Sequence, residues 1–254
     1  MAPIPSYLLT MLVFFSSAFV QGVIGFGFNI LTVPFLTILA DAKTAVSVVS
    51  IPSQLNCVLL ALRPQSTPGA PFAWQPGLLL PILLTGAVGT IAGASLLVAL
   101  DPSLALTGLG VLVLLFVLTD RVRRNWQPNP RHERPLALVV GLVTGLLSGL
   151  AGVSGPTLVP YLHSRKLDKH QFVTYLNMLF LCFGCYQWIV FFFLGLYTWP
   201  RVLEAAGFIP AALLGIGLGA RVRNRVSAAF FNRLVLLILF VTGLDLIRRG
   251  LHLF

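Results

Sequence analysis

Two glycine-rich clusters hold the residues of this sequence that are best suited to chemistry. The first reads Gly22-Val-Ile-Gly25-Phe-Gly27-Phe28-Asn29, and the second reads Gly149-Leu-Ala-Gly152-Val-Ser154-Gly155-Pro156. Such clusters weaken a helix interior and permit turns. A helix that restarts after the turn presents unpaired N–H groups and the positive end of its dipole, which favour an anion. The sequence therefore predicts two anion-binding helix starts, near Phe28 and near Thr157.

Uncharged polar side chains close to the clusters can add hydrogen-bond donors without a fixed charge that would trap the ligand. Further candidates for the wall of the site follow in the next segments of each half: Ser50, Ser53, Asn56, Thr174 and Gln187. For these five residues, a hydrogen bond to a neighbouring helix is the favoured interpretation. For Gln54 and Asn177, a hydrogen bond to a neighbouring helix is an equally good interpretation. The predicted substrate-binding residues are Gly22, Gly25, Gly27, Phe28, Asn29, Gln54, Gly149, Gly152, Ser154, Gly155, Thr157 and Asn177.

The composition of the chain places these clusters in a membrane. Of its 254 residues, 57% are hydrophobic and 9% are charged, whereas soluble domains carry about 25% charged residues. This excludes a soluble enzyme or a nucleic-acid-binding module, and the net charge of +10 is assigned to basic loops beside membrane spans. The apolar segments run approximately over 7–39, 44–62, 77–100, 103–119, 136–162, 171–198, 202–220 and 228–247.

The first and fifth apolar segments contain the glycine clusters, and the first is too long for one crossing of a hydrocarbon core of about 30 Å. Irregular backbone at membrane depth is tolerated only where it is buried in protein or lines a cavity. We therefore expect both segments to be broken, with the two breaks facing a shared site near the middle of the membrane.

An internal duplication relates the two clusters. Gly22 and Gly25 recur as Gly149 and Gly152 at an offset of 127, and four later residues recur at an offset of 126: Pro34, Lys43, Gly89 and Gly93. The chain is therefore predicted to consist of two homologous halves, 1–120 and 136–254, joined by a basic linker over 121–135. The pairs Gly89/Gly93 and Gly215/Gly219 are interpreted as close helix-packing motifs rather than functional residues.

The positions of the basic residues favour one topology. If all eight segments cross the membrane, nine Lys and Arg residues lie on one side and eight on the other. If the first and fifth segments are re-entrant, thirteen lie on one side, and four lie on the other, namely Lys43, Arg201, Arg248 and Arg249. The second distribution follows the positive-inside rule. We therefore expect an all-α polytopic membrane protein whose halves form an inverted repeat, each with a re-entrant first segment and three spanning helices.

The two clusters resemble the paired signatures of the TauE/SafE family, the sulfite exporter or toluene-sulfonate uptake permeases, and the later glycine pairs fit the same pattern. The resemblance implies a permease of the bacterial inner membrane for small organic or sulfur-containing anions, such as sulfite, sulfonates or sulfoacetate, with the loop 121–135 in the cytoplasm. Where many members carry a run of glycines, this chain has Phe26, Phe28 and Asn29 in the first cluster and Ser154 in the second. These departures leave the substrate open.

The acidic residues lie near segment ends, so no carboxylate is placed at mid-membrane to relay a proton or hold sodium. No motif for catalysis, a metal or a nucleotide appears, so we expect no enzyme activity, no metal and no cofactor. The alternatives are a passive channel or facilitator for other small carboxylates or oxyanions, and a membrane scaffold that transports nothing. The expected partners are a small anion and the lipid bilayer, with no nucleic acid; a homodimer stays open.

Overall fold

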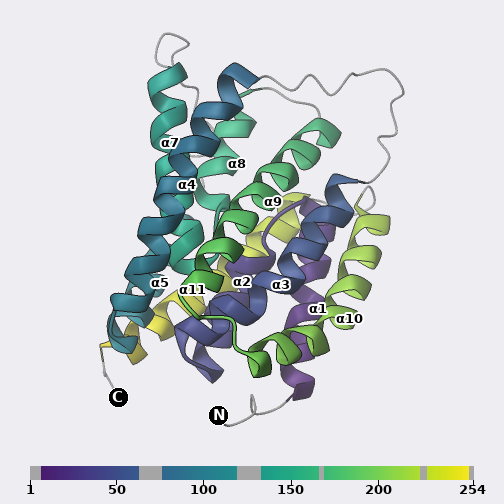
Figure 1. Ribbon diagram of the computed structural model, residues 1–254. Helices are drawn as coiled ribbons and strands as arrows, with labels where there is room; N and C mark the ends of the chain where they lie inside the picture. Colours follow the sequence, from purple (N-terminus) through teal and green to yellow (C-terminus); the bar gives the residue numbers. More distant parts are fainter. Residues whose placement is uncertain (1–6, 63–75, 119–132, 166–168, 224–227, 252–254) are drawn as a thin grey trace.

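The computed structural model describes residues 7–62, 76–118, 133–165, 169–223 and 228–251, and all regular structure in them is α-helical (Figure 1). The first half contains α1 (Tyr7–Ile24), α2 (Phe28–Leu39), α3 (Ala42–Ala61), α4 (Pro76–Ala99) and α5 (Pro102–Leu118). The second half contains α7 (Glu133–Ala151), α8 (Gly155–His163), α9 (Lys169–Phe193), α10 (Trp199–Val222) and α11 (Ala228–Gly250).

Six helices in the described residues are long and apolar enough to cross a membrane: α1, α3, α4, α7, α9 and α10. Apolar side chains such as Leu84, Phe193 and Leu214 are more than half exposed on the outside of the bundle, where a soluble protein would carry charge. The predicted all-helical, multi-pass membrane fold is therefore confirmed.

Both predicted interruptions are present. Between α1 and α2 the backbone passes through positive φ at Gly25 (φ 94°) and Gly27 (φ 110°), and between α7 and α8 it does so at Gly152 (φ 68°). A residue with a β-carbon is strained in this conformation, whereas glycine is not. The glycine clusters therefore end one helix and allow a second to start within a few residues.

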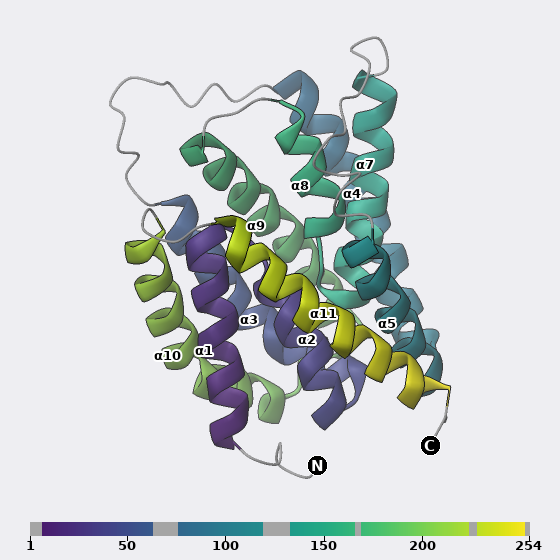
Figure 2. The same ribbon diagram turned by 180° about the vertical axis from the view of Figure 1, so that it is seen from behind.

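Each interruption folds its segment into a hairpin with unequal arms. α1 has 18 residues and α2 has 12, while α7 has 19 and α8 has 9. Figure 2 shows the open ends of α1 and α2 at the lower end of the molecule, near both chain termini, and those of α7 and α8 at the upper end. These opposite directions agree with the predicted inverted repeat, which stays a prediction that the labelling experiment below tests.

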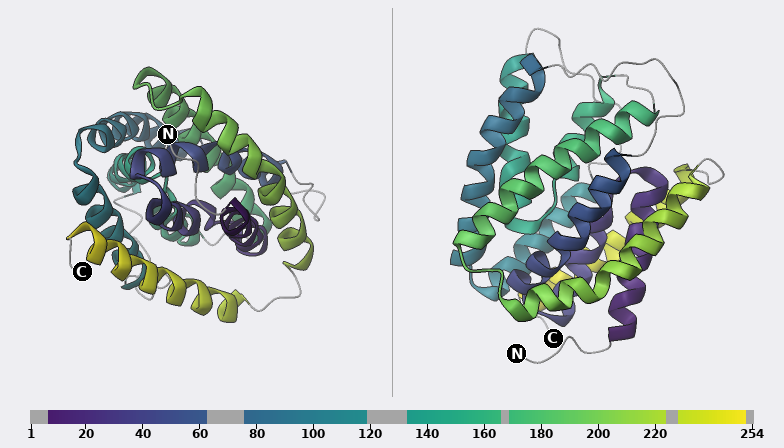
Figure 3. Two further views of the ribbon diagram at one scale, coloured as in Figure 1. Left: turned by 90° about the horizontal axis from the view of Figure 1, so that it is seen from below. Right: turned by 45° about the vertical axis from the view of Figure 1, so that its right-hand side comes forward.

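The helix contacts follow the duplication. α1 packs along α10, α4 packs along α7, and the two pairs lie on opposite sides of α3 and α9 (Figure 3). Glycine makes the close approach possible: a β-carbon added to Gly22 would lie 2.6 Å from the backbone oxygen of Ile216, and one added to Gly145 would overlap the backbone of Gly86. The interpretation of Gly89/Gly93 and Gly215/Gly219 as packing motifs is confirmed, because each also faces backbone of the partner helix.

Polar contacts gather the ends of three helices at the lower end of the molecule. The Lys43 ammonium donates to the backbone oxygen of Val98 at 2.9 Å, which ties the start of α3 to the end of α4. Partial burial raises the pKa of the Asp41 carboxyl, but hydrogen bonds from Thr44, together with nearby Arg201 at the start of α10, hold this pKa below its ordinary value. Asp41 is therefore ionised at neutral pH.

The structure also bears on the boundary between the halves. α7 begins at Glu133, so the last three residues of the predicted linker, 133–135, are helical, and the division of the chain into two halves and a linker stays a prediction. The rest of that linker, 121–132, lies outside the described residues.

Cysteine labelling can decide which helix ends share a side of the membrane. In a variant without the native cysteines, Asp101→Cys and Trp199→Cys should react with a membrane-impermeant reagent from one side, and Arg134→Cys from the other. All three positions are exposed, and Figure 1 shows the start of α7 at the end of the molecule opposite to the end of α4 and the start of α10. Eight complete crossings would put positions 101 and 199 on opposite sides. Labelling of positions 101 and 199 from opposite sides of the membrane would therefore contradict the re-entrant topology.

Candidate functional site

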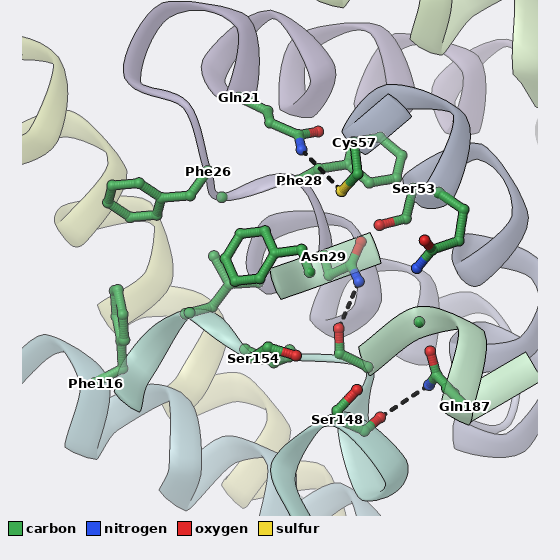
Figure 4. Close-up of a pocket in the computed structure, with 18 residues that line it drawn as sticks. Gln21, Phe26, Phe28, Asn29, Ser53, Cys57, Phe116, Ser148, Ser154 and Gln187 are labelled. Carbon is green, nitrogen blue, oxygen red and sulfur yellow. Dashed lines mark hydrogen bonds between the residues drawn. The ribbon is translucent and has the colours of Figure 1, made fainter. Parts of the chain in front are cut away.

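The two interruptions meet at a cavity between the halves of the chain (Figure 4). The cavity lies near the middle of α3 and α9 and leaves about 40 Å³ for the centres of water-sized molecules, which is room for roughly three waters. None of its lining residues carries a charge. They are Gln21, Phe26, Gly27, Phe28, Asn29, Ile30, Ser53, Gln54, Cys57, Phe116, Ser148, Gly152, Val153, Ser154, Gly155, Phe180, Gly184 and Gln187.

The start of α2 contributes unpaired N–H groups to the cavity wall. The backbone N–H groups of Phe28, Asn29 and Ile30 donate to no acceptor in the part of the chain that the structure describes, and the first bond of the helix runs from Leu31 to the Gly27 oxygen at 3.2 Å. These are the orphan donors that every helix start leaves. They coincide with the positive end of the α2 dipole.

The start of α8 repeats this arrangement in the second half. Ser154 precedes α8 as Gly27 precedes α2, Gly155 is its first residue, and Pro156 has no N–H. Within the described residues, the N–H groups of Gly155 and Thr157 also donate to no acceptor. The two helix starts therefore present backbone donors to one cavity from opposite halves.

Aromatic packing fixes the position of the α2 start. The ring of Phe28 is 1% exposed and lies edge-on to the ring of Phe14, with centroids 5.7 Å apart. Phe14 in turn stacks on Phe208 of α10, with centroids 4.6 Å apart. The side chain of Phe28 is therefore an anchor, and its backbone N–H is the group that it brings to the cavity.

At the opposite pole of each break, where α1 and α7 end, two carbonyl groups accept hydrogen bonds from side chains. The Asn177 amide donates to the Gly25 oxygen at 2.9 Å, and the Arg223 guanidinium donates to the Gly22 oxygen at 2.9 Å. In the other half, Asn29 donates to the Gly152 oxygen and Gln187 to the Ser148 oxygen. These bonds cover the negative ends of the two dipoles with donors.

Asn177 is the centre of the network that holds the first break. Its amide nitrogen also donates to the Val173 oxygen at 2.8 Å, and its oxygen accepts a bond from the Gln21 amide at 3.4 Å. The Asn177 side chain is fully buried. Because its nitrogen faces two carbonyl groups, its oxygen must be the atom that faces Gln21.

The crossing of α3 over α9 forms another part of the wall. The amide of Gln54 lies directly over Gly184, where a β-carbon would overlap it, and the three atoms nearest to that position all belong to Gln54. Gln54 is 6% exposed, and its amide oxygen has no hydrogen-bond partner among the described residues. Gly184 therefore makes room for the Gln54 side chain at the cavity.

The structure brings seven of the predicted substrate-binding residues to the cavity wall. They are Gly27, Phe28, Asn29, Gln54, Gly152, Ser154 and Gly155. Gly25 and Asn177 lie just behind the wall and bond each other. Ser53 and Gln187 from the wider set of candidates also line the cavity, whereas Ser50, Asn56 and Thr174 do not.

Three predicted residues have contacts of another kind. Gly22 and Gly149 face the backbones of α10 and α4, where they permit close packing. The Thr157 hydroxyl bonds the Thr144 hydroxyl of α7. Gly22 and Gly149 therefore pack against neighbouring helices, and Thr157 bonds a neighbouring helix, away from the cavity wall.

Several lining residues escaped the sequence analysis, among them Gln21, Phe26, Cys57, Phe116, Ser148 and Phe180. One signal could have found two of them, because Gln21 and Ser148 are related by the offset of 127 that relates the two glycine clusters. Phe26 lies within the first glycine cluster, whereas Phe116 and Phe180 carry no such signal, since only the three-dimensional fold brings α5 and α9 to the breaks.

The described residues contain no group of three or more His, Cys, Asp or Glu side chains that could hold a metal ion. The side chains of the lining residues are instead amides, hydroxyls, one thiol, phenyl rings and the aliphatic groups of Ile30 and Val153. Neutral donors of this kind bind and orient a small solute.

Comparison with known proteins gives one match. The model of the family described as Sulfite exporter TauE/SafE matches residues 9–246, and so includes both helix breaks and nearly all of the described helices. No curated protein and no solved structure matches the chain significantly.

Proposed function

The chain belongs to the sulfite exporter TauE/SafE family of membrane transporters, and from this premise we propose that it binds small sulfur-containing or organic anions in the cavity between its helix breaks. Sulfite, sulfonates and sulfoacetate-like anions are the proposed substrates. The protein is a transporter of the sulfite or anion exporter type rather than an enzyme, and it crosses the membrane several times.

The contrast between the two poles of each break carries the proposal. Two carbonyl groups at or next to the end of each of α1 and α7 accept hydrogen bonds from side chains, while the N–H groups at the starts of α2 and α8 donate to no acceptor in the described chain. A site with partly covered carbonyls and open N–H groups offers donors and positive potential, which match an anion and disfavour a cation.

The size and neutrality of the cavity support a compact ligand. Room for roughly three waters suits an anion of the size of sulfite or a small sulfonate. Because the lining residues carry no charge, an anion would be held by several weak donors and no ion pair would have to break for its release. Such binding is favourable enough to capture a solute and weak enough to let it leave.

The sidedness of the protein is part of the proposal. We place the upper helix ends, which carry Arg134, Arg165 and Arg221, in the cytoplasm, because positive residues accumulate on that side of a bacterial inner membrane. The basic linker before α7 would then be cytoplasmic as well.

The function is tested with the purified protein in lipid vesicles. Uptake and efflux of labelled sulfite, sulfoacetate, taurine and acetate are measured against empty vesicles, and we expect saturable flux of at least one anion together with competition among anions of similar size. Flux of sodium or potassium with no flux of any anion would contradict the proposed site. Absence of flux for every solute would favour the scaffold alternative.

The substitution Gly184→Ala should weaken anion binding and leave the fold intact. The added methyl group meets only the tip of the Gln54 side chain, which can move without a backbone shift, so the Gln54 amide leaves the cavity wall. Loss of one hydrogen bond to a charged ligand amounts to about 1.5–3 kcal/mol, so we expect KM to rise roughly 10- to 100-fold. Initial transport rates at varied anion concentration measure this change.

Gly217→Ala in α10 is the matched control, because no atom lies within 4 Å of its added β-carbon. The variant Gln54→Ser should have the same KM as the double variant Gln54→Ser/Gly184→Ala. Additive losses in the double variant would show that Gly184 does not act through Gln54.

A further inference from the structure

Among the four side chains that satisfy carbonyl groups at the breaks, Arg223 alone carries a charge. Asn177, Asn29 and Gln187 supply neutral amides, whereas the Nε–H of Arg223 donates to the Gly22 oxygen at 2.9 Å from a partly buried position. A guanidinium stays protonated under all physiological conditions. The end of α1 is therefore the one pole of the two breaks that receives a full positive charge.

Helix packing determines where this charge lies. Arg223 is the residue that follows α10, and α10 runs alongside α1 with Gly219 facing the backbone of Phe19 and Gly22 facing that of Ile216 and Ala220. Because these contacts are between backbones, the register of the two helices has little freedom. The guanidinium is thus held at the residue next to Gln21, which lines the cavity.

The position equivalent to Arg223 in the first half carries no charge. The offset of 126 that relates α4 to α10 assigns Leu97 to the position of Arg223, and Leu97 is an apolar side chain that is 1% exposed. The duplicated scaffold therefore has a positive charge beside one break and a leucine at the equivalent place beside the other.

We propose that Arg223 is a specificity-determining residue, which raises the affinity of the cavity for anions by holding a positive charge against the end of α1. This inference rests on the proposed function. The guanidinium offsets the negative end of the α1 dipole, which would otherwise repel an anion bound at the start of α2. Arg223 acts through the electrostatic potential at the cavity and through its hydrogen bond to the end of α1, and it does not have to contact the ligand.

The test compares the variants Arg223→Gln and Arg223→Lys with the unchanged protein in lipid vesicles. We expect Arg223→Gln to raise KM for sulfite about tenfold, the size of a favourable charge-to-dipole interaction, with little change in the maximal rate. Arg223→Lys, which keeps the charge, should stay within about threefold of the unchanged protein. Arg221→Gln is the control, because it removes the same charge from an exposed position two residues away.

The charge of the ligand provides a readout that a purely structural role would not affect. Coulomb energy is proportional to ligand charge, so the loss of affinity in Arg223→Gln should be about twice as large on a logarithmic scale for dianionic sulfite, measured at alkaline pH, as for monoanionic methanesulfonate. Equal losses for the two anions, or equal losses in the Lys and Gln variants, would overturn the inference. If the unchanged protein transports no anion at all, the proposed function itself fails.

Discussion

Replacing Gly25 with leucine is expected to abolish anion transport while the protein still accumulates in the membrane. Gly25 has φ 94°, where a side chain is strained, and its β-carbon would lie 2.7 Å from a methyl group of Val173. Residues forced into such conformations cost about 1–3 kcal/mol each. The chain can relieve this strain only by moving the Gly25 carbonyl away from Asn177, which would also shift the start of α2.

Initial rates of sulfite or sulfonate flux in vesicles measure the effect, and we expect a loss of more than about 100-fold, because displaced donors at a charged site and backbone strain add up to several kcal/mol. Gly195→Leu is the matched control. Gly195 also has positive φ, at 67°, but no atom lies within 4 Å of its added β-carbon, and it lies in the turn after α9. Normal flux in Gly25→Leu would show that the break is not part of the site.

The equivalent position in the second half should behave in the same way. Gly152 has φ 68°, and its β-carbon would approach Val46, Gln187 and Asn29, of which the last two belong to the cavity wall. A loss of flux in Gly152→Leu together with normal flux in Gly195→Leu would show that backbone strain abolishes transport when it lies at the break and not when it lies in the turn after α9.

The sequence was informative about the breaks because their cause is local. Glycine at positive φ leaves a pattern that can be read from neighbouring residues, and the same offset marks both copies. Gly22 and Gly149 show the limit of this signal, since they belong to the same clusters but serve close packing against α10 and α4. Glycine permits both a positive φ at a helix break and close packing between helices, and only the backbone conformation in the structure shows which of the two a given glycine serves.

The rest of the site could not be predicted because it depends on contacts between the halves. Phe116 of α5 and Phe180 of α9 line the cavity, although neither is near a glycine cluster in sequence. In the sequence, Arg223 is one of three arginines over 221–225, and it acquires its bond to Gly22 only because α10 runs parallel to α1. Residues that work across the two halves leave no local pattern.

Replacing Asn177 with leucine should lower both stability and transport, because leucine has nearly the same volume but makes none of the three hydrogen bonds of the Asn177 side chain. The substitution leaves the Gly25 and Val173 oxygens without the Asn177 donor and leaves the Gln21 amide with only the Cys57 sulfur as an acceptor. Each buried polar group left unsatisfied costs about 1–3 kcal/mol. We expect lower thermal stability in detergent and a loss of transport of at least about tenfold.

Asn56→Leu makes the same chemical change at a second fully buried asparagine and serves as the control. Neither polar atom of the Asn56 amide has a hydrogen-bond partner among the described residues, and Asn56 does not line the cavity, so its replacement should keep both stability and flux.

In Asn177→Asp, the acceptor for Gln21 is kept while a negative charge is placed behind the first break. If the Asn177 amide serves only to hold the fold, the Asp variant should transport better than the Leu variant. If the cavity binds an anion, that charge repels the ligand and the Asp variant should be the poorer transporter, with the larger deficit for dianionic sulfite.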